Sequence, residues 1–193
     1  MRDGSAPAEP APGSPPALRV GPALVDQARQ LDPEAWDALY RSVYPRLRAY
    51  VARRVGAGMA EDLVNETMTR AVAGIDRFVP GPAGMEGWLF GIARRVTADH
   101  LRRAERERRA FGRTAADVPG ETPGEAFELG EDAAWVRAKF ALLSRSEQDI
   151  LELRVVAGLS ADDVAIALGK RPGAVRTAQS RALANLRKLM DQS

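Results

Sequence analysis

The chain has no cysteine and only one histidine, His100, among its 193 residues. Disulfide frameworks and thiolate metal sites are therefore excluded, which fits a reducing compartment such as the cytoplasm. No apolar run approaches the roughly 18 to 20 residues that a membrane-spanning helix needs, so we expect no membrane insertion. The N-terminus also lacks the basic start and apolar stretch of a signal peptide.

The sequence offers little for catalysis. His100 and its neighbour Asp99 point about 100° apart on a helix, so they do not converge as a catalytic dyad. Glu61, Asp62 and Glu66 could bind a divalent cation, but no second cluster of ligands accompanies them. No phosphate-cradling glycine-rich motif and no nucleophile elbow is present. We therefore predict no enzymatic activity, no metal site and no cofactor.

Charge is segregated along the chain, although the net charge is only +2. The stretch 114–134 contains six acidic residues, several prolines and glycines, and no lysine or arginine. This composition predicts a flexible, extended acidic linker. It serves either as a plain solvated tether or as a mimic of nucleic acid. Residues 1–22 are rich in proline, alanine, glycine and serine, and their lack of large apolar groups predicts disorder.

Apolar residues that recur every three or four positions predict helices before the linker. The first begins after Asp32, an N-cap followed by Pro33, and ends at 56–58. Pro45 should kink this helix or divide it near Tyr44. Two further helices are expected at about 60–75 and 86–108. The segment 78–84 between them is too rich in proline and glycine for regular structure.

After the linker, the capping and turn residues of the sequence predict three helices. Ser144 and Ser160 each precede an acidic residue three positions later, which is a capping box. Gly158 and Gly169 stand where left-handed residues would end the first two helices. Pro172 opens the third at a position where a missing N–H costs little. A helix, a tight turn and a second helix form the helix-turn-helix pattern of DNA-binding proteins.

The third of these helices carries a positive patch. Six cations and no acid lie between positions 170 and 188: Lys170, Arg171, Arg176, Arg181, Arg187 and Lys188. Such a segment is typical of phosphate binding, although a solvated helix face would have the same composition. Because the cations begin at a helix N-terminus after a turn, we favour DNA binding.

Three ordered motifs together resemble the extracytoplasmic-function (ECF) group of bacterial sigma factors, the promoter-recognition subunits of RNA polymerase. They are Ala60-Glu-Asp-Leu-Val-Asn-Glu-Thr67, the segment from Trp88 to Arg103, and the C-terminal helix-turn-helix. The resemblance implies an all-α fold of two small helical domains joined by the acidic linker. The expected limits are a disordered tail at 1–22, a sigma region-two-like bundle at 23–108, the linker at 109–131, and a region-four-like helix-turn-helix domain at 132–193.

The resemblance also implies partners and site residues. The partners are core RNA polymerase, through its clamp coiled coil and flap, promoter DNA, and an anti-sigma factor. The residues that match the polymerase-docking segment are Glu61, Asp62, Leu63, Val64, Asn65 and Glu66. Those that match the segment for the −10 promoter element are Arg94, Arg95, Asp99, Arg102 and Arg103. Those that match the −35 helix-turn-helix are Lys170, Arg171, Gly173, Ala174, Arg176, Thr177, Ser180 and Arg181.

Several questions stay open at this point. The alternative to a sigma factor is a stand-alone helix-turn-helix regulator that binds an operator unaided. Trp88 could stack on a base, but the start of an amphipathic helix favours a core position. Gln179 could reach DNA or lie at the domain edge. Arg171 replaces the serine N-cap that is common in the family, so we expect a DNA phosphate to cap this helix in the bound state.

Overall fold

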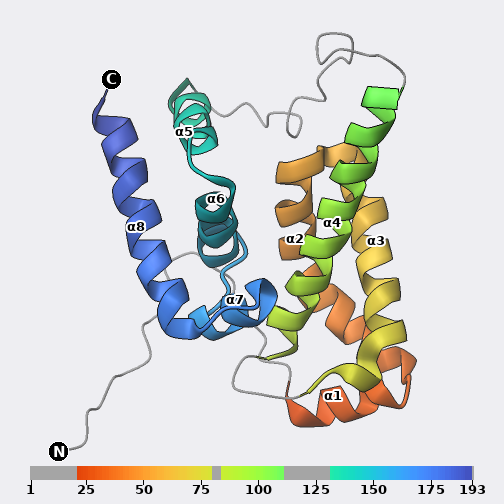
Figure 1. The fold of residues 1–193 in the computed structure, drawn as a ribbon. Helices are drawn as coiled ribbons and strands as arrows, with labels where there is room; N and C mark the ends of the chain where they lie inside the picture. The colour runs from red at the N-terminus through yellow and green to blue at the C-terminus, as the bar shows by residue number, and fades with distance from the viewer. Residues whose placement is uncertain (1–20, 80–83, 111–130, 193) are drawn as a thin grey trace, which may run out of the picture.

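The computed structural model describes residues 21–79, 84–110 and 131–192, and this part of the chain is helical with no strand (Figure 1). The predicted all-α class is therefore confirmed. The predicted disordered tail lies almost wholly outside the described residues. The acidic linker and the tip of the proline-rich loop, at 111–130 and 80–83, also lie outside them.

The N-terminal half consists of four helices around one core. They are α1 (Pro22–Arg29), α2 (Pro33–Val55), α3 (Ala57–Gly74) and α4 (Met85–Ala110), with a short 3-10 turn, η1 (Ile75–Arg77), after α3. Asp32 caps α2 as predicted, because its side chain accepts a hydrogen bond from the Glu34 amide. Helix α1 was not predicted. It is held by its buried residues Val25 and Ala28, and the Trp36 indole N–H donates to the Ala28 carbonyl at 3.0 Å.

The predicted division of the first long helix at Pro45 is wrong. Helix α2 continues from Pro33 to Val55 with the proline inside it. Both halves bury side chains in the same core, with Leu39 and Val43 before the proline and Leu47 and Tyr50 after it. Burying four large side chains stabilises by more than the ~3 kcal/mol that an interior proline costs.

The C-terminal half consists of α5 (Glu131–Ala141), α6 (Arg145–Leu151), a π-helical turn η2 (Glu152–Val156), α7 (Ala161–Leu168) and α8 (Pro172–Asp191). Both predicted capping boxes are present, at Ser144 and Ser160. Gly158 and Gly169 have φ angles of 66° and 63°, as their predicted roles require. Helices α7 and α8 form the expected helix-turn-helix.

The two halves pack against each other along α4 and α7 (Figure 1). One continuous core includes Leu89 and Phe90 of α4 together with Leu159, Val164 and Val175 of the C-terminal half. A second, smaller core between α6 and α8 contains Leu143, Leu151 and Ala182. The hydrophobic interior of the C-terminal half is therefore split between its own small core and the shared one.

Gly169 makes the turn between α7 and α8, and we expect Gly169→Ala to destabilise the protein. A β-carbon in the left-handed region costs roughly 1–2 kcal/mol. Gly169→Asn should cost less, because asparagine visits this region more readily. Urea unfolding followed by circular dichroism measures both. Equal stability of the alanine variant and the wild type would contradict the assigned turn.

Candidate nucleic-acid interface

Helix α8 separates an apolar stripe from an exposed basic face. Val175 and Ala182 are buried, and Leu186 and Leu189 are half-buried against α6. The predicted −35 residues are all exposed: Lys170, Arg171, Gly173, Ala174, Arg176, Thr177, Ser180 and Arg181. Within the described residues, no cation between positions 170 and 188 forms an ion pair. Their charge is therefore available to an external anion.

The N-terminus of α8 has no side-chain cap. Arg171 occupies the N-cap position with extended backbone angles (φ −88°, ψ 145°), and its side chain accepts no hydrogen bond from the first turn. Pro172 removes one orphan N–H. The amides of the next residues still point out of the helix and add to its positive end. This end of α8 therefore presents both fixed dipoles and mobile guanidinium groups.

Arg154 of η2 fixes α8 on the domain. Its Nε donates to Gln179 Oε1 at 2.8 Å, and its Nη1 donates to the Leu159 carbonyl. The side-chain oxygen of Gln179 is thus hydrogen-bonded within the domain. Burial lowers the pKa of Arg154 and Arg176 lowers it further, while Asp163 opposes them. The hydrogen bonds aim the guanidinium inward and leave Arg176 to face solvent.

Glu147 ties α6 to α8. Its carboxylate accepts hydrogen bonds from the Ser144 amide at 2.9 Å, from the Ser144 hydroxyl at 2.6 Å, and from the Asn185 amide on α8. The hydrogen bond from the Ser144 side chain, followed by that from Asn185, lowers the pKa of Glu147. The helix-turn-helix therefore has a polar clamp at the end opposite Gly169.

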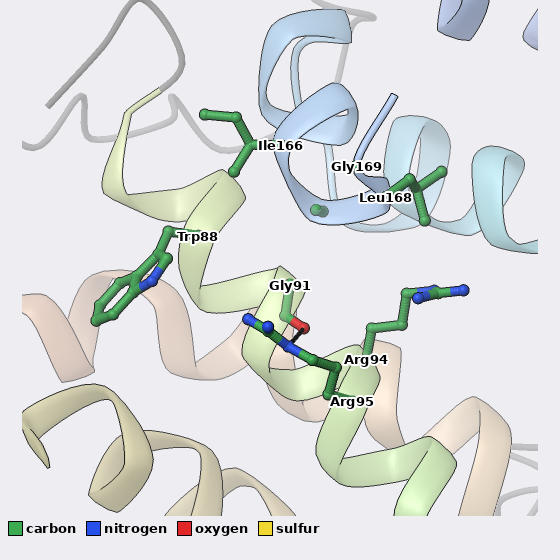
Figure 2. A pocket seen from close by; sticks show the side chains of 8 residues that line it. Trp88, Gly91, Arg94, Arg95, Ile166, Leu168 and Gly169 are labelled. Atoms are coloured by element: carbon green, nitrogen blue, oxygen red, sulfur yellow. Dashed lines mark hydrogen bonds between the residues drawn. The ribbon is translucent and has the colours of Figure 1, made fainter. Parts of the chain in front are cut away.

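The predicted −10 residues lie on α4 and are largely paired within the protein. Arg94 Nε lies 3.1 Å from Asp149 Oδ2, and Arg102 pairs with Asp99. Arg95 is exposed, and its Nε donates to the Gly91 carbonyl at 3.1 Å (Figure 2). Exposed Arg103 has no ion pair among the described residues.

Arg106 is a further exposed cation on α4, and it was not among the predicted site residues. Its Nε donates only to the Arg102 carbonyl. Its position, three residues beyond Arg103 on the same face of the helix, is the signal that could have found it.

The aromatic residues near this face belong to the core. Phe78 and Phe90 are buried, and the ring of Trp88 lies 5.3 Å from that of Phe78. Trp88 and Arg94 leave α4 on different sides (Figure 2). Both border an open depression of about 290 Å³ between α4 and the end of α7. Trp88 is partly buried and packs against the core, as the amphipathic pattern predicts.

The acidic segment of α3 presents four polar side chains to solvent. Glu61, Asp62, Asn65 and Glu66 are exposed. Leu63 and Val64, also predicted for docking, are only 5% and 0% exposed and belong to the core. The sequence left their role open between apolar contact and core, and the structure places them in the core.

The described residues show no group of three or more histidine, cysteine or acidic side chains that could hold a metal ion. Among the same residues, none of the helices combines the length and the apolar character that crossing a membrane demands.

Comparisons with known proteins match both halves of the chain. The family model for sigma-70 region 2 matches residues 39–107, and that for sigma-70 region 4 matches residues 133–186. The ECF RNA polymerase sigma factor ShbA of Streptomyces griseus is 32% identical over 181 residues, which cover 88% of this chain and 95% of that protein.

Two solved structures are similar in fold. One is CnrH in complex with the cytosolic domain of CnrY, with a TM-score of 0.65 and 23% identity over 89% of this chain and 97% of that one. The other is the sigma factor RpoE of Bartonella quintana in complex with the anti-sigma factor NepR. Its TM-score is 0.62 at 26% identity, over 82% of this chain and 98% of that one.

Replacing Glu147 with glutamine should make stability less dependent on pH. A carboxylate whose pKa is lowered by folding contributes stability above its unfolded pKa of about 4.5, and this is lost as pH falls through the lower folded pKa. Glutamine preserves the capping geometry but not the charge. The variant should be less stable than the wild type at pH 7, and the difference should shrink below pH 4.5. Urea unfolding at several pH values measures this, and a constant difference would contradict it.

Proposed function

Since this chain belongs to the ECF sigma factors of RNA polymerase, we propose a division of labour among three of its exposed faces. It is an alternative sigma factor for transcription initiation, and its family comprises DNA-binding initiation factors. The alternative of a stand-alone helix-turn-helix regulator is excluded, because both sigma regions are present in order and the match to a sigma factor covers most of the chain. The open questions are which surfaces act, and how.

The acidic face of α3 docks on the clamp coiled coil of core RNA polymerase. Its support is the exposure of Glu61, Asp62, Asn65 and Glu66 on one side of a helix whose other side is core. Tyr40 borders this face, and its hydroxyl lies 3.5 Å from Asn65 Oδ1. A cluster of acids and an amide suits an arginine-rich partner. The C-terminal domain contacts a second part of the same enzyme, the flap of core RNA polymerase.

The basic face of α8 reads the −35 element, and this is the best supported of the three assignments. The observation that carries it is the exposed row of cations without an internal ion pair. Arg176 and Arg181 are both exposed, and a bidentate contact of either one to guanine is feasible. Arg171 and the uncapped first turn of α8 hold a phosphate.

The face of α4 binds the −10 element through Arg95, Arg102 and Arg103, to which we add Arg106. Arg94 and Asp99 contribute after their internal partners are displaced. Opening a duplex needs cations along the separated strand, and a helix with arginines at spacings of three and four supplies them. The core packing of Trp88 argues that base stacking is not its role.

The remaining assignments are proposals of the same standing. The functional domains span 23–108 and 132–193, with a tail at 1–22 and the linker at 109–131, and the protein acts in the cytoplasm. An anti-sigma factor is a further proposed partner. Its support is the RpoE relative, which was solved with its anti-sigma factor NepR.

The docking assignment predicts that Glu61→Lys weakens association with core polymerase by about tenfold, or ~1.4 kcal/mol. The reason is that a cation then faces a basic partner. Asp76→Lys is the matched control, because Asp76 is an exposed acid on η1, outside the docking face. Titration of fluorescently labelled chain with core enzyme measures the affinity. Run-off transcription from a mapped promoter measures the activity.

Two outcomes would count against this picture. Equal effects of both substitutions would contradict the assignment of docking to the α3 face, but not the role of the chain as a sigma factor. A wild-type chain that never associates with core enzyme, or associates and never directs initiation, would remove the proposed function itself.

The −35 assignment predicts opposite effects of Arg171→Ser on the free protein and on the complex. Serine is a good N-cap, so the free chain should gain about 0.5–2 kcal/mol of stability. Promoter binding by holoenzyme should weaken, and its log–log salt slope should fall by about 1, because one phosphate contact is lost. Arg145→Ser, at an exposed position of α6, controls for the lost charge. An unchanged salt slope would show that Arg171 does not hold phosphate.

A further inference from the structure

Two tyrosines lie one turn apart on α2, and their rings stack. The ring centroids of Tyr40 and Tyr44 are 4.9 Å apart, and the ring planes differ by 30°. Each follows a fully buried core residue, Leu39 or Val43, so both rings stand at the edge of the core. They pack against the core but are only half-buried, which leaves part of each ring in contact with solvent. We call these two side chains the tyrosine pair.

The tyrosine pair adjoins the acidic face of α3. The Tyr40 hydroxyl lies 3.5 Å from Oδ1 of Asn65, an exposed residue of that face. Burial raises the pKa of Tyr40, and Tyr44 and the charge of Glu61 raise it further. The carboxylate of Glu61 is therefore close enough to act on the tyrosine. Helices α2 and α3 pack on each other, so aromatic rings and a carboxylate border one continuous surface.

This surface has no cation of its own. Elsewhere the chain places an arginine on a ring, since the guanidinium carbon of Arg54 lies 4.4 Å from the centre of the Tyr50 ring. Within the described ranges, no lysine or arginine lies over Tyr40 or Tyr44. The faces of these two rings are therefore not used for a cation–π contact inside the protein.

A guanidinium is the cation that such a surface favours. It is planar, so it can stack on a ring while its N–H groups donate to a neighbouring carboxylate. It is also more weakly hydrated than the ammonium group of lysine and loses less when it leaves water. Tyrosine and arginine are among the residues that most often dominate the energy of a protein interface. A lysine would satisfy the carboxylate but would not stack in the same way.

We propose that the tyrosine pair is part of the polymerase-docking surface and binds one arginine side chain of the clamp coiled coil, which stacks on the rings and pairs with Glu61. This rests on the proposed docking of the α3 face and extends that face onto α2. It also defines the partner group as a guanidinium. Salt screens the attraction to Glu61, whereas the surface that stacking buries keeps its contribution in salt.

Replacing the rings with leucine tests the proposal. Leucine is apolar and a good helix former, so α2 and its packing should be retained while the aromatic faces are lost. Tyr40→Leu with Tyr44→Leu should weaken binding of the full chain to core RNA polymerase by about fivefold. Tyr40→Phe with Tyr44→Phe is the matched conservative variant, and because it keeps both rings it should restore most of that loss. Circular dichroism and urea unfolding verify the fold of each variant.

A double-mutant cycle with Glu61→Gln shows whether the rings and the carboxylate hold the same cation. If they share one guanidinium, the combined loss of affinity should be smaller than the product of the separate losses. The loss from Glu61→Gln should shrink as salt is raised, and the loss from the leucine variant should persist. Losses that simply multiply would overturn the shared arginine.

The polymerase side gives a second readout. Each arginine of the clamp coiled coil is replaced in turn by lysine, which keeps the charge but stacks poorly. At the arginine that binds the tyrosine pair, this change should weaken binding of the wild-type chain and have little further effect on the leucine variant. If no clamp arginine behaves in this way, the proposal is wrong.

The remaining outcomes separate this proposal from the docking assignment on which it rests. Normal affinity of the leucine variant, or equal losses for the leucine and phenylalanine variants, would overturn the role of the rings while Glu61→Lys still tests the α3 face. A weakened leucine variant beside a normal Glu61→Lys would contradict both the α3 assignment and the shared arginine. Normal affinity of both would remove the docking surface as a whole.

Discussion

The close approach of α4 and α7 is the constraint on which the rest of this structure depends. Gly87 and Gly91 remove two side chains from the first two turns of α4, and the backbone of α7 occupies that space. Glycine in a helix interior costs up to ~1 kcal/mol relative to alanine. The shared core that this contact allows more than offsets that cost, because it buries Leu159, Val164 and Val175 together with the side chains of α4. The position of the helix-turn-helix follows from this contact.

Arg54 and Arg94 of the N-terminal half pair with Asp149 and Glu152 of the C-terminal half. These ion pairs define how the halves fit together more than how strongly they bind. Burying an ion pair costs much of what its attraction returns, so such pairs are poor sources of stability. Removing one partner is nevertheless expensive, because the other charge is left in a low-dielectric site. Burial by itself lowers the pKa of Arg54, but Tyr50, Glu152 and Asp149 outweigh it and raise the pKa, so the group stays charged. The cluster thus tolerates one docking geometry and penalises others.

Local features were readable from the sequence because their causes are local. A capping serine, a left-handed glycine and an N-terminal proline act within one helical turn, and Ser144, Gly169 and Pro172 behave as expected. Pro45 does not divide the helix, because its penalty is outweighed by burial in a core that includes residues far along the chain. Helix α1 was missed because it has only eight residues and only two large apolar side chains, Leu24 and Val25.

The contact between α4 and α7 could not be predicted from the sequence. Gly87 and Gly91 read as ordinary weak points of a helical pattern, and nothing local says which surface will approach them. The partners of Arg54 and Arg94 lie 55 to 98 residues away. Most of the predicted site residues lie on exposed helix faces, while Leu63 and Val64 are buried. The pairing that distinguishes Arg94 from Arg103 could not be foreseen. Arg94 differs from Arg103 only in a contact that the three-dimensional structure reveals, its ion pair with Asp149.

That pairing makes the two proposed DNA faces physically unequal. The cations of α8 have no internal carboxylate partners among the described residues, so a phosphate that approaches them competes only with water and counterions. On α4, a phosphate must also displace Asp149 from Arg94 and Asp99 from Arg102. Neither carboxylate is then left alone, because Asp149 keeps its ion pair with Arg54 and Asp99 keeps its ion pair with Arg70. Phosphate binding at the α8 face therefore breaks no internal ion pair among the described residues, whereas phosphate binding at Arg94 breaks a contact between the two halves of the chain.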